Sequence, residues 1–224
     1  MSAGTTIASI LLLCALCATG LTLWLKQQQI LQREAFQALA ARRGWSLTVS
    51  EQKLGRPAIL RLTSRSGSGW YSESRLDSGD KQGTRNSLST LFAAAEPHWP
   101  EGCLVLTTDL PEGATGPQPV GRSLQNLAHR ISMAVPVGLQ AQLRGFPAPA
   151  GLSVRATVDP VHRFDLDALA KVIDAWDPQS HTRATEPVIQ IGPEGFRVQV
   201  NHGMRRADQM EIFIDYALAV VRVL

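Results

Sequence analysis

The feature that most constrains this chain is an uncharged, mainly apolar run near its N-terminus. Residues 6–25 carry no formal charge, and Lys26 ends the run. As a helix with ~1.5 Å rise per residue, the run would be about 30 Å long, which matches the hydrocarbon core of a bilayer. Trp24 lies at its end, where an indole ring favours the headgroup region. The run therefore predicts a transmembrane anchor over residues 1–25.

A cleaved signal peptide is the alternative interpretation of the same run. A signal peptide has a basic region before its apolar core, whereas no Lys or Arg precedes Lys26. Ala18-Thr19-Gly20 offers a cleavage site, but the apolar run continues through residues 21–25. Cleavage would leave an extracytoplasmic domain, for which we would expect ligand binding. The uncleaved anchor is the interpretation that we favour.

Flanking charge predicts how the anchor is oriented. The N-terminal side has no basic residue, while Lys26, Arg33, Arg42 and Arg43 follow the run. Because basic residues stay on the cytoplasmic side, the body is expected in the cytoplasm, at the bacterial inner (plasma) membrane. These four residues and Trp24 are the candidate membrane-interface residues.

The net charge also bears on the partners of the chain. The chain carries a formal net charge of +3, from 22 basic and 19 acidic residues. Residues 26–50 hold four of the basic residues and one of the acidic ones, so the charges of the remaining chain sum to zero. This balance argues against a nucleic-acid-binding domain and favours contact between the juxtamembrane segment and anionic lipids. Membrane lipids and an unidentified protein are therefore the expected partners, and nucleic acid is not.

A juxtamembrane helix is predicted over residues 26–44. Residues 27–43 contain neither Gly nor Pro, and Gly44 is placed to end the helix after two arginines. The apolar residues that form one stripe on this helix are Ile30, Leu31, Ala35, Ala38 and Leu39. This stripe is expected to dock onto the core of the domain or to pair with another helix.

The rest of the chain, residues 45–224, is predicted to form a mixed α+β domain. Short apolar or alternating segments bounded by turn residues predict strands at 45–50, 57–63, 70–76, 103–108 and 152–158. Residues 88–95 fit either a strand or a helix. The Pro- and Gly-rich stretch 109–121 is the candidate boundary between two subdomains.

Three helices are expected within this domain. Ser123 is expected to cap a short helix that ends at Pro136, and Asp165 to cap a second helix. The third is a C-terminal core helix, because apolar residues recur at helical spacing up to residue 224. Asp208 and Glu211 have capping-box spacing at its start.

A β-hairpin before the C-terminal helix is the clearest local pattern. Two apolar segments, 188–191 and 196–200, flank Gly192-Pro193-Glu194-Gly195. This arrangement predicts a hairpin with a four-residue loop.

The layout resembles a broad group of bacterial single-pass, membrane-anchored α+β proteins of unknown function. The similarity lies in the anchor, the Arg42-Arg43-Gly44-Trp45 exit, and the hairpin followed by a C-terminal helix. It implies a fold arrangement and transfers no activity and no functional residue.

Two groups of residues are the candidates for chemistry. His98 and Cys103 are five residues apart and would suit nucleophilic catalysis if the imidazole raised the thiolate fraction. Asp159, His162, Asp165 and Asp167 form the densest ionisable cluster, suited to acid–base chemistry. Simpler roles compete with both: a buried, inert thiol for Cys103, and turn or helix-capping roles for the carboxylates.

The expected function follows from the anchor and from the motifs that the sequence lacks. No phosphate-binding loop, dinucleotide fingerprint, nucleophile elbow or zinc-protease motif occurs, and no two histidines have metal-ligand spacing. We therefore expect no cofactor and no metal. The favoured prediction is a membrane-tethered, non-catalytic interaction or accessory domain. A membrane-associated enzyme using His98 and Cys103 or the Asp159–Asp167 cluster is the alternative.

Overall fold

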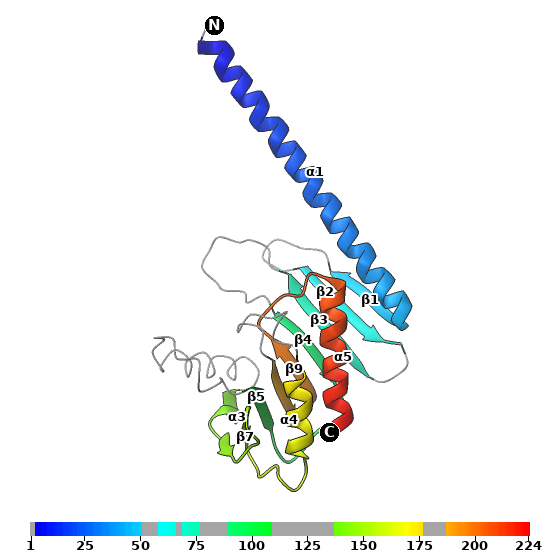
Figure 1. The fold of residues 1–224 in the computed structure, drawn as a ribbon, viewed down its shortest axis with the longest axis vertical. Coiled ribbons are helices and arrows are strands. Elements are labelled where there is room, and N and C mark those ends of the chain that lie inside the picture. Colours follow the sequence, from blue (N-terminus) through cyan, green and yellow to red (C-terminus); the bar gives the residue numbers. More distant parts are fainter. Residues whose placement is uncertain (1–2, 51–57, 66–68, 77–88, 109–136, 177–186) are drawn as a thin grey trace.

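The structure is a computed structural model that describes all but residues 1–2, 51–57, 66–68, 77–88, 109–136 and 177–186 (Figure 1). Helix α1 (Ala3–Arg43) leads into a body of strands and helices, so the α+β class is confirmed. Over the described parts of the chain, no helix is both long and apolar enough to cross a bilayer. The predicted transmembrane span is therefore unsupported by this finding and stays a prediction.

The body is built on one antiparallel sheet. Its nine described strands follow the order β1-β2-β3-β4-β9-β8-β5-β7-β6, and every neighbouring pair is antiparallel. The strands are β1 (Trp45–Ser50), β2 (Ala58–Ser64), β3 (Trp70–Leu76), β4 (Ser89–Ala94), β5 (Leu104–Thr108), β6 (Arg144–Phe146), β7 (Leu152–Ala156), β8 (Val188–Gly192) and β9 (Gly195–Val200). The predicted strands at 45–50 and 70–76 are confirmed at both ends, and the undecided segment 88–95 contains β4.

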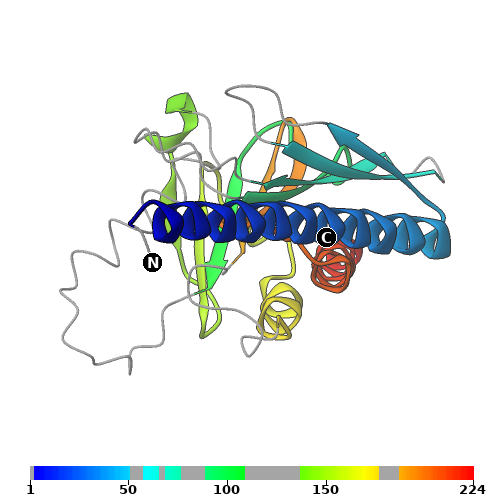
Figure 2. The same ribbon diagram turned by 90° about the horizontal axis from the view of Figure 1, so that it is seen from above.

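One face of this sheet forms the core of the domain. Leu60 and Leu62 are buried on it while Arg61 between them is not, as the alternation in β2 predicts. Helices α4 (Leu166–Asp174) and α5 (Ala207–Val223) cover this face (Figure 2). On the opposite face, Cys103, Val105 and Val188 form a smaller buried cluster. Leu139 of a short helix, α3 (Val137–Gln140), packs against it.

Two helix ends show how local sequence is used. Asp165 caps α4, as predicted, and accepts a hydrogen bond from the Ala168 backbone N–H at 2.9 Å. The capping box predicted for the C-terminal helix is wrong. Arg206 is the N-cap of α5 without any side-chain cap bond, and the Asp208 carboxylate bonds the Arg206 guanidinium instead.

The predicted hairpin is confirmed as β8 and β9, but its loop is shorter than predicted. Gly192 pairs with Gly195, so the strands extend into the expected loop and leave only Pro193 and Glu194 in the turn. Gly195 has φ +103°, and a Cβ there would lie 2.3 Å from the Ala94 carbonyl oxygen. Only glycine fits this position.

Two further predictions fall on residues outside the described ranges. These are the helix that Ser123 was expected to cap and the subdomain boundary at 109–121. The strands that precede and follow this stretch belong to the same sheet, since β5 pairs with both β7 and β8.

Candidate functional site

Helix α1 joins the body only through its last turns. Phe36, Leu39 and Ala40 are buried in the core, at 2%, 4% and 4% exposure. Every described side chain from Cys17 to Ala35 is exposed, and the helix extends well beyond the body (Figure 1). We call residues 17–35 the stalk.

Large apolar side chains lie uncovered on the stalk. Leu21, Leu23 and Trp24 are 57%, 67% and 56% exposed. Because successive residues are about 100° apart around a helix, Leu21 and Trp24 lie on one side of it and Leu23 on another. Large apolar side chains are therefore exposed on more than one side of the stalk.

Of the two roles expected for the apolar stripe within residues 26–44, docking onto the core is seen for one residue, and pairing with another helix stays a prediction. Ile30 and Leu31 are 58% and 51% exposed, and Ala35 and Ala38 are exposed as well, so only Leu39 of that stripe reaches the core. Phe36, which the prediction missed, is the largest side chain that α1 buries. Phe36 lies three and four residues before Leu39 and Ala40, and this spacing indicates that the three share one helix face.

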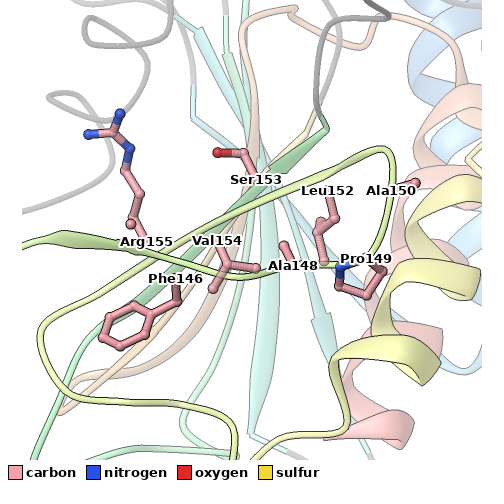
Figure 3. Close-up of a pocket in the computed structure, with 9 residues that line it drawn as sticks. Phe146, Ala148, Pro149, Ala150, Leu152, Ser153, Val154 and Arg155 are labelled. Carbon is pink, nitrogen blue, oxygen red and sulfur yellow. The ribbon is translucent and has the colours of Figure 1, made fainter.

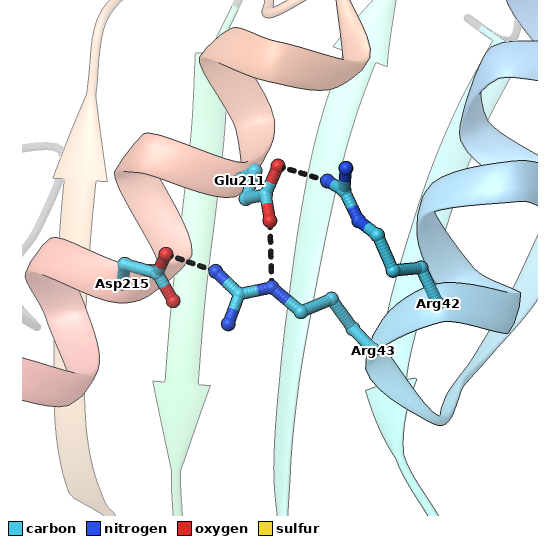
Figure 4. Close-up of polar contacts among 4 residues, drawn as sticks. All are labelled: Arg42, Arg43, Glu211 and Asp215. Carbon is cyan, nitrogen blue, oxygen red and sulfur yellow. Dashed lines mark hydrogen bonds and ion pairs between the residues drawn. The ribbon is translucent and has the colours of Figure 1, made fainter.

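The end of α1 is also held to α5 by ion pairs, which we call the arginine junction (Figure 4). Arg42 Nη2 donates to Glu211 Oε2 at 2.5 Å, and Arg43 Nε donates to Glu211 Oε1 at 2.6 Å. Arg43 Nη2 also bonds Asp215, and the Arg43 guanidinium lies 5.5 Å from the centre of the Trp45 ring. The hydrogen bond from Arg43 to Glu211 raises the pKa of Arg43 above its ordinary value.

The apolar contact contributes more to this attachment than the ion pairs do. The four side chains of the junction are 21% to 65% exposed. Partly exposed ion pairs contribute ~0.2–1 kcal/mol each, whereas truncating a buried Phe costs ~3–5 kcal/mol. Burial of Phe36 is therefore the larger contribution to the attachment, and the arginine junction adds a smaller one.

The structure divides the predicted membrane-interface residues into two groups. Trp24, Lys26 and Arg33 are exposed on the stalk. Arg42 and Arg43 already have carboxylate partners inside the domain. They also lie ~24 Å along the helix from Lys26. Physiological salt screens charges over ~8 Å, so Arg42 and Arg43 would interact little with charges at the level of Lys26.

The structure gives His98 and Cys103 separate partners. His98 Nδ1 lies 2.9 Å from Glu96 Oε2, and its side chain is 45% exposed. Cys103 is fully buried, and its sulfur accepts a long contact of 3.9 Å from Gln190 Nε2. Burial raises the pKa of the Cys103 thiol, which disfavours the reactive thiolate.

The carboxylates of the Asp159–Asp167 cluster serve local structure. Asp159 Oδ1 accepts from the Val161 backbone N–H at 3.0 Å, Asp165 caps α4, and Asp167 lies in the first turn of α4. His162 is exposed. Among the described residues, no three His, Cys, Asp or Glu side chains are grouped so as to hold a metal ion.

The two candidate clusters nevertheless lie beside each other. Arg163 Nη2 donates to the His98 backbone oxygen at 3.4 Å, and the rings of Trp99 and Phe164 meet edge to face, with centres 5.4 Å apart. The contact between the two clusters is thus made by the Arg163 side chain, the His98 carbonyl and the rings of Trp99 and Phe164. The acidic and thiol groups that the enzyme hypothesis needs take no part in it.

A shallow hollow of about 340 Å³ lies at the β6–β7 edge of the sheet (Figure 3). Its walls come from β6, from β7 and from the Ala148–Ala150 segment between them. Arg155 is its one charged lining residue, and Ser153 is the other polar side chain. None of the predicted site residues lines it.

Comparisons with known proteins do not identify a family. No protein-family model matches the chain, and no curated protein matches its sequence. Among solved structures, the mycobacterial trehalose monomycolate transport factor A, TtfA, is similar over 86% of this chain and 94% of its own, with 12% identity and a TM-score of 0.40. Likeness at this level supports no conclusion about family or function.

Proposed function

We propose that the protein is a membrane-tethered, non-catalytic interaction domain, with its body in the cytoplasm. The observation that carries the proposal is the exposure of Leu21 and Trp24 on one side, and of Leu23 on another side, of a helix that extends from the body. Such side chains are stable when lipid surrounds the helix. The uncharged run 6–25 supplies the length for this placement.

The proposal fixes how far the body lies from the bilayer. If Lys26 marks the headgroup level, Phe36 lies ~15 Å further along the helix. The turns of α1 that pack on the body then lie beyond the headgroups, on the side where cytoplasmic segments of other membrane proteins would be within reach.

The cytoplasmic orientation then depends on fewer charges than the sequence suggests. Because Arg42 and Arg43 are paired with Glu211 and Asp215, we assign the membrane interface to Trp24, Lys26 and Arg33. Lys26 and Arg33 follow the uncharged run, and no Lys or Arg precedes it in the sequence. This difference in basic residues still favours a cytoplasmic body.

The native cysteines provide the test. Cys17 is exposed on the stalk, and Cys103 is buried in the body. In a Cys14→Ser background reconstituted into vesicles, lipid should protect Cys17 from a charged, water-soluble maleimide, and the fold should protect Cys103.

A matched variant separates lipid protection from a fault in labelling. Gln37→Cys, combined with Cys14→Ser and Cys17→Ser, places a thiol at an exposed position of the same helix, beyond the proposed interface. We expect rapid labelling of this thiol and little labelling of Cys17. Equal labelling at both positions would contradict the tether, and intact-mass evidence for an N-terminus near Leu21 would favour signal cleavage instead.

A further inference from the structure

The two edges of the sheet differ in how well they are protected. At one edge, β6 has three residues and runs into a segment with Pro147 and Pro149, which lack N–H donors. At the other edge, β1 has six residues, Trp-Ser-Leu-Thr-Val-Ser, with no charge, no Pro and no Gly. Edge strands normally carry charge, Pro or a bulge because a plain edge invites another strand to pair.

Strand β1 is paired on one side only, as far as the described residues show. β1 pairs with β2 along its whole length, from Trp45 opposite Ser64 to Ser50 opposite Ile59. Every second residue of an edge strand points its N–H and C=O away from its neighbour. Over the described residues, no backbone hydrogen bond joins β1 to any segment other than β2. Within the described part of the chain, the outward donors and acceptors of β1 therefore have no backbone partner.

The side chains of β1 show what an added strand would look like. Leu47 and Val49 lie on the core side of the sheet, Leu47 packing against the core and Val49 remaining 40% exposed. Ser46 and Thr48 lie on the opposite, polar face. A strand that extends the sheet would continue this alternation, with apolar residues on the side of Val49.

We infer that β1 is the docking edge for an extended, uncharged segment of a protein partner with alternating apolar and polar residues. The inference deepens the proposed function, on which it rests for the choice of occupant. Main-chain hydrogen bonds would supply affinity, and the Val49 side would supply specificity.

A second copy of this chain is the rival occupant, and the tether disfavours it. When two identical edge strands pair antiparallel, a twofold axis perpendicular to the sheet relates the two copies. Any element that lies parallel to the sheet then points in opposite directions in the two copies. Helix α1 runs roughly parallel to the sheet near β1 (Figures 1 and 2). The two stalks would point in opposite directions and could not enter one bilayer.

Hydrogen exchange of the full chain in lipid nanodiscs tests the inference. The probe is a short synthetic peptide of alternating Val and Thr flanked by Lys. When about nine-tenths of the protein is bound, the outward amides of β1 should exchange ~tenfold more slowly, because only the unbound fraction exchanges. The same peptide with N-methyl groups on the residues that face β1 should have no effect.

A pair of matched variants locates the binding. Val49→Lys places a charge at the edge and should abolish the protection by the peptide. Val161→Lys makes the same change at a residue that is 53% exposed outside the edge, and it should behave as wild type. Protection that survives Val49→Lys, appears with the N-methylated peptide, or concentrates on β6 would overturn the inference. The N-methyl comparison uses the wild-type chain, so it decides even if Val49→Lys misfolds.

A photo-reactive residue at position 49 in native membranes decides between the occupants. We expect a cross-link whose partner peptide, identified by mass spectrometry, has the alternating pattern, and no such product from position 161. A product of two copies of this chain would overturn the choice of occupant. Loss of peptide binding with Cys17 still protected by lipid would refute the docking edge alone, whereas labelling of Cys17 would refute the tether.

Discussion

The attachment of α1 can be tested by truncating Phe36, which is 2% exposed in the core. Phe36→Ala removes a buried ring and should lower the free energy of unfolding by ~3–5 kcal/mol. A typical domain has only ~5–15 kcal/mol in total, so the change should be large. Phe36→Leu keeps most of the apolar volume and should cost less than ~1.5 kcal/mol.

The arginine junction gives the contrasting perturbation. Arg43→Gln breaks contacts with Glu211 and Asp215, side chains that are 21% and 47% exposed. Because water screens such pairs, we expect a loss of ~1 kcal/mol at most for each pair. Gln37→Ala, at an exposed neighbour of Phe36, should stay within ~0.5 kcal/mol of wild type.

Guanidinium unfolding in mild detergent, followed by tryptophan fluorescence, measures these differences, and amide exchange of residues 36–43 reports detachment of the helix end. Phe36→Ala should accelerate that exchange, whereas Gln37→Ala should not. The reasoning is refuted if Arg43→Gln costs more than Phe36→Ala, or if Phe36→Ala matches Gln37→Ala. The first result would mean that charge contributes more than apolar burial, and the second that burial of Phe36 does not hold α1.

Three further outcomes follow from particular contacts. Gly195→Ala should destabilise the fold by more than ~2 kcal/mol in thermal unfolding, because of its positive φ and the backbone contact, whereas Gly145→Ala, where a Cβ meets nothing within 4 Å, should be close to neutral. Tyr216→Phe should raise the melting temperature or leave it unchanged, since the buried Tyr216 hydroxyl has no hydrogen-bond partner among the residues that the structure describes. The Arg206 hydrogen bond lowers the pKa of Asp208, so its stabilisation is present above the unfolded-state pKa and lost as pH falls through the folded value. Arg206→Ala should move the carboxyl titration of Asp208, followed by NMR, back up towards pH 3.8.

Strands with one polar face could be predicted from the sequence, and fully apolar ones could not. In β2, Arg61 between Leu60 and Leu62 shows a period of two. In β4, Phe92 and Ala93 are both buried although they face opposite sides of the sheet, so the segment has no period and fits a helix equally well. The order of the strands leaves no local signal, because β4 pairs with β9, which lies some hundred residues later in the chain.

The attachment site was missed because its charges are distant in sequence. Arg42 and Arg43 look like membrane-flanking cations when only their neighbours are considered. Glu211 looks like part of a capping box with Asp208 for the same reason. Once the chain folds, Glu211 meets both arginines, a tertiary contact that none of the three residues' sequence neighbours indicates.

Helix α1 and the proposed docking edge are joined by one residue, Gly44. Gly44 has φ +67°, ends α1 and leads directly into β1 at Trp45. Phe36 and the arginine junction hold the helix end on one side of this turn, and the six pairs with β2 hold the strand on the other. Strand β1 therefore cannot rotate independently of α1. On the proposed placement, its free edge lies within ~30 Å of the headgroups along the helix and at a fixed angle to the bilayer. A partner strand anchored in the same membrane would meet this edge without a search over orientations, which lowers the entropic cost of pairing.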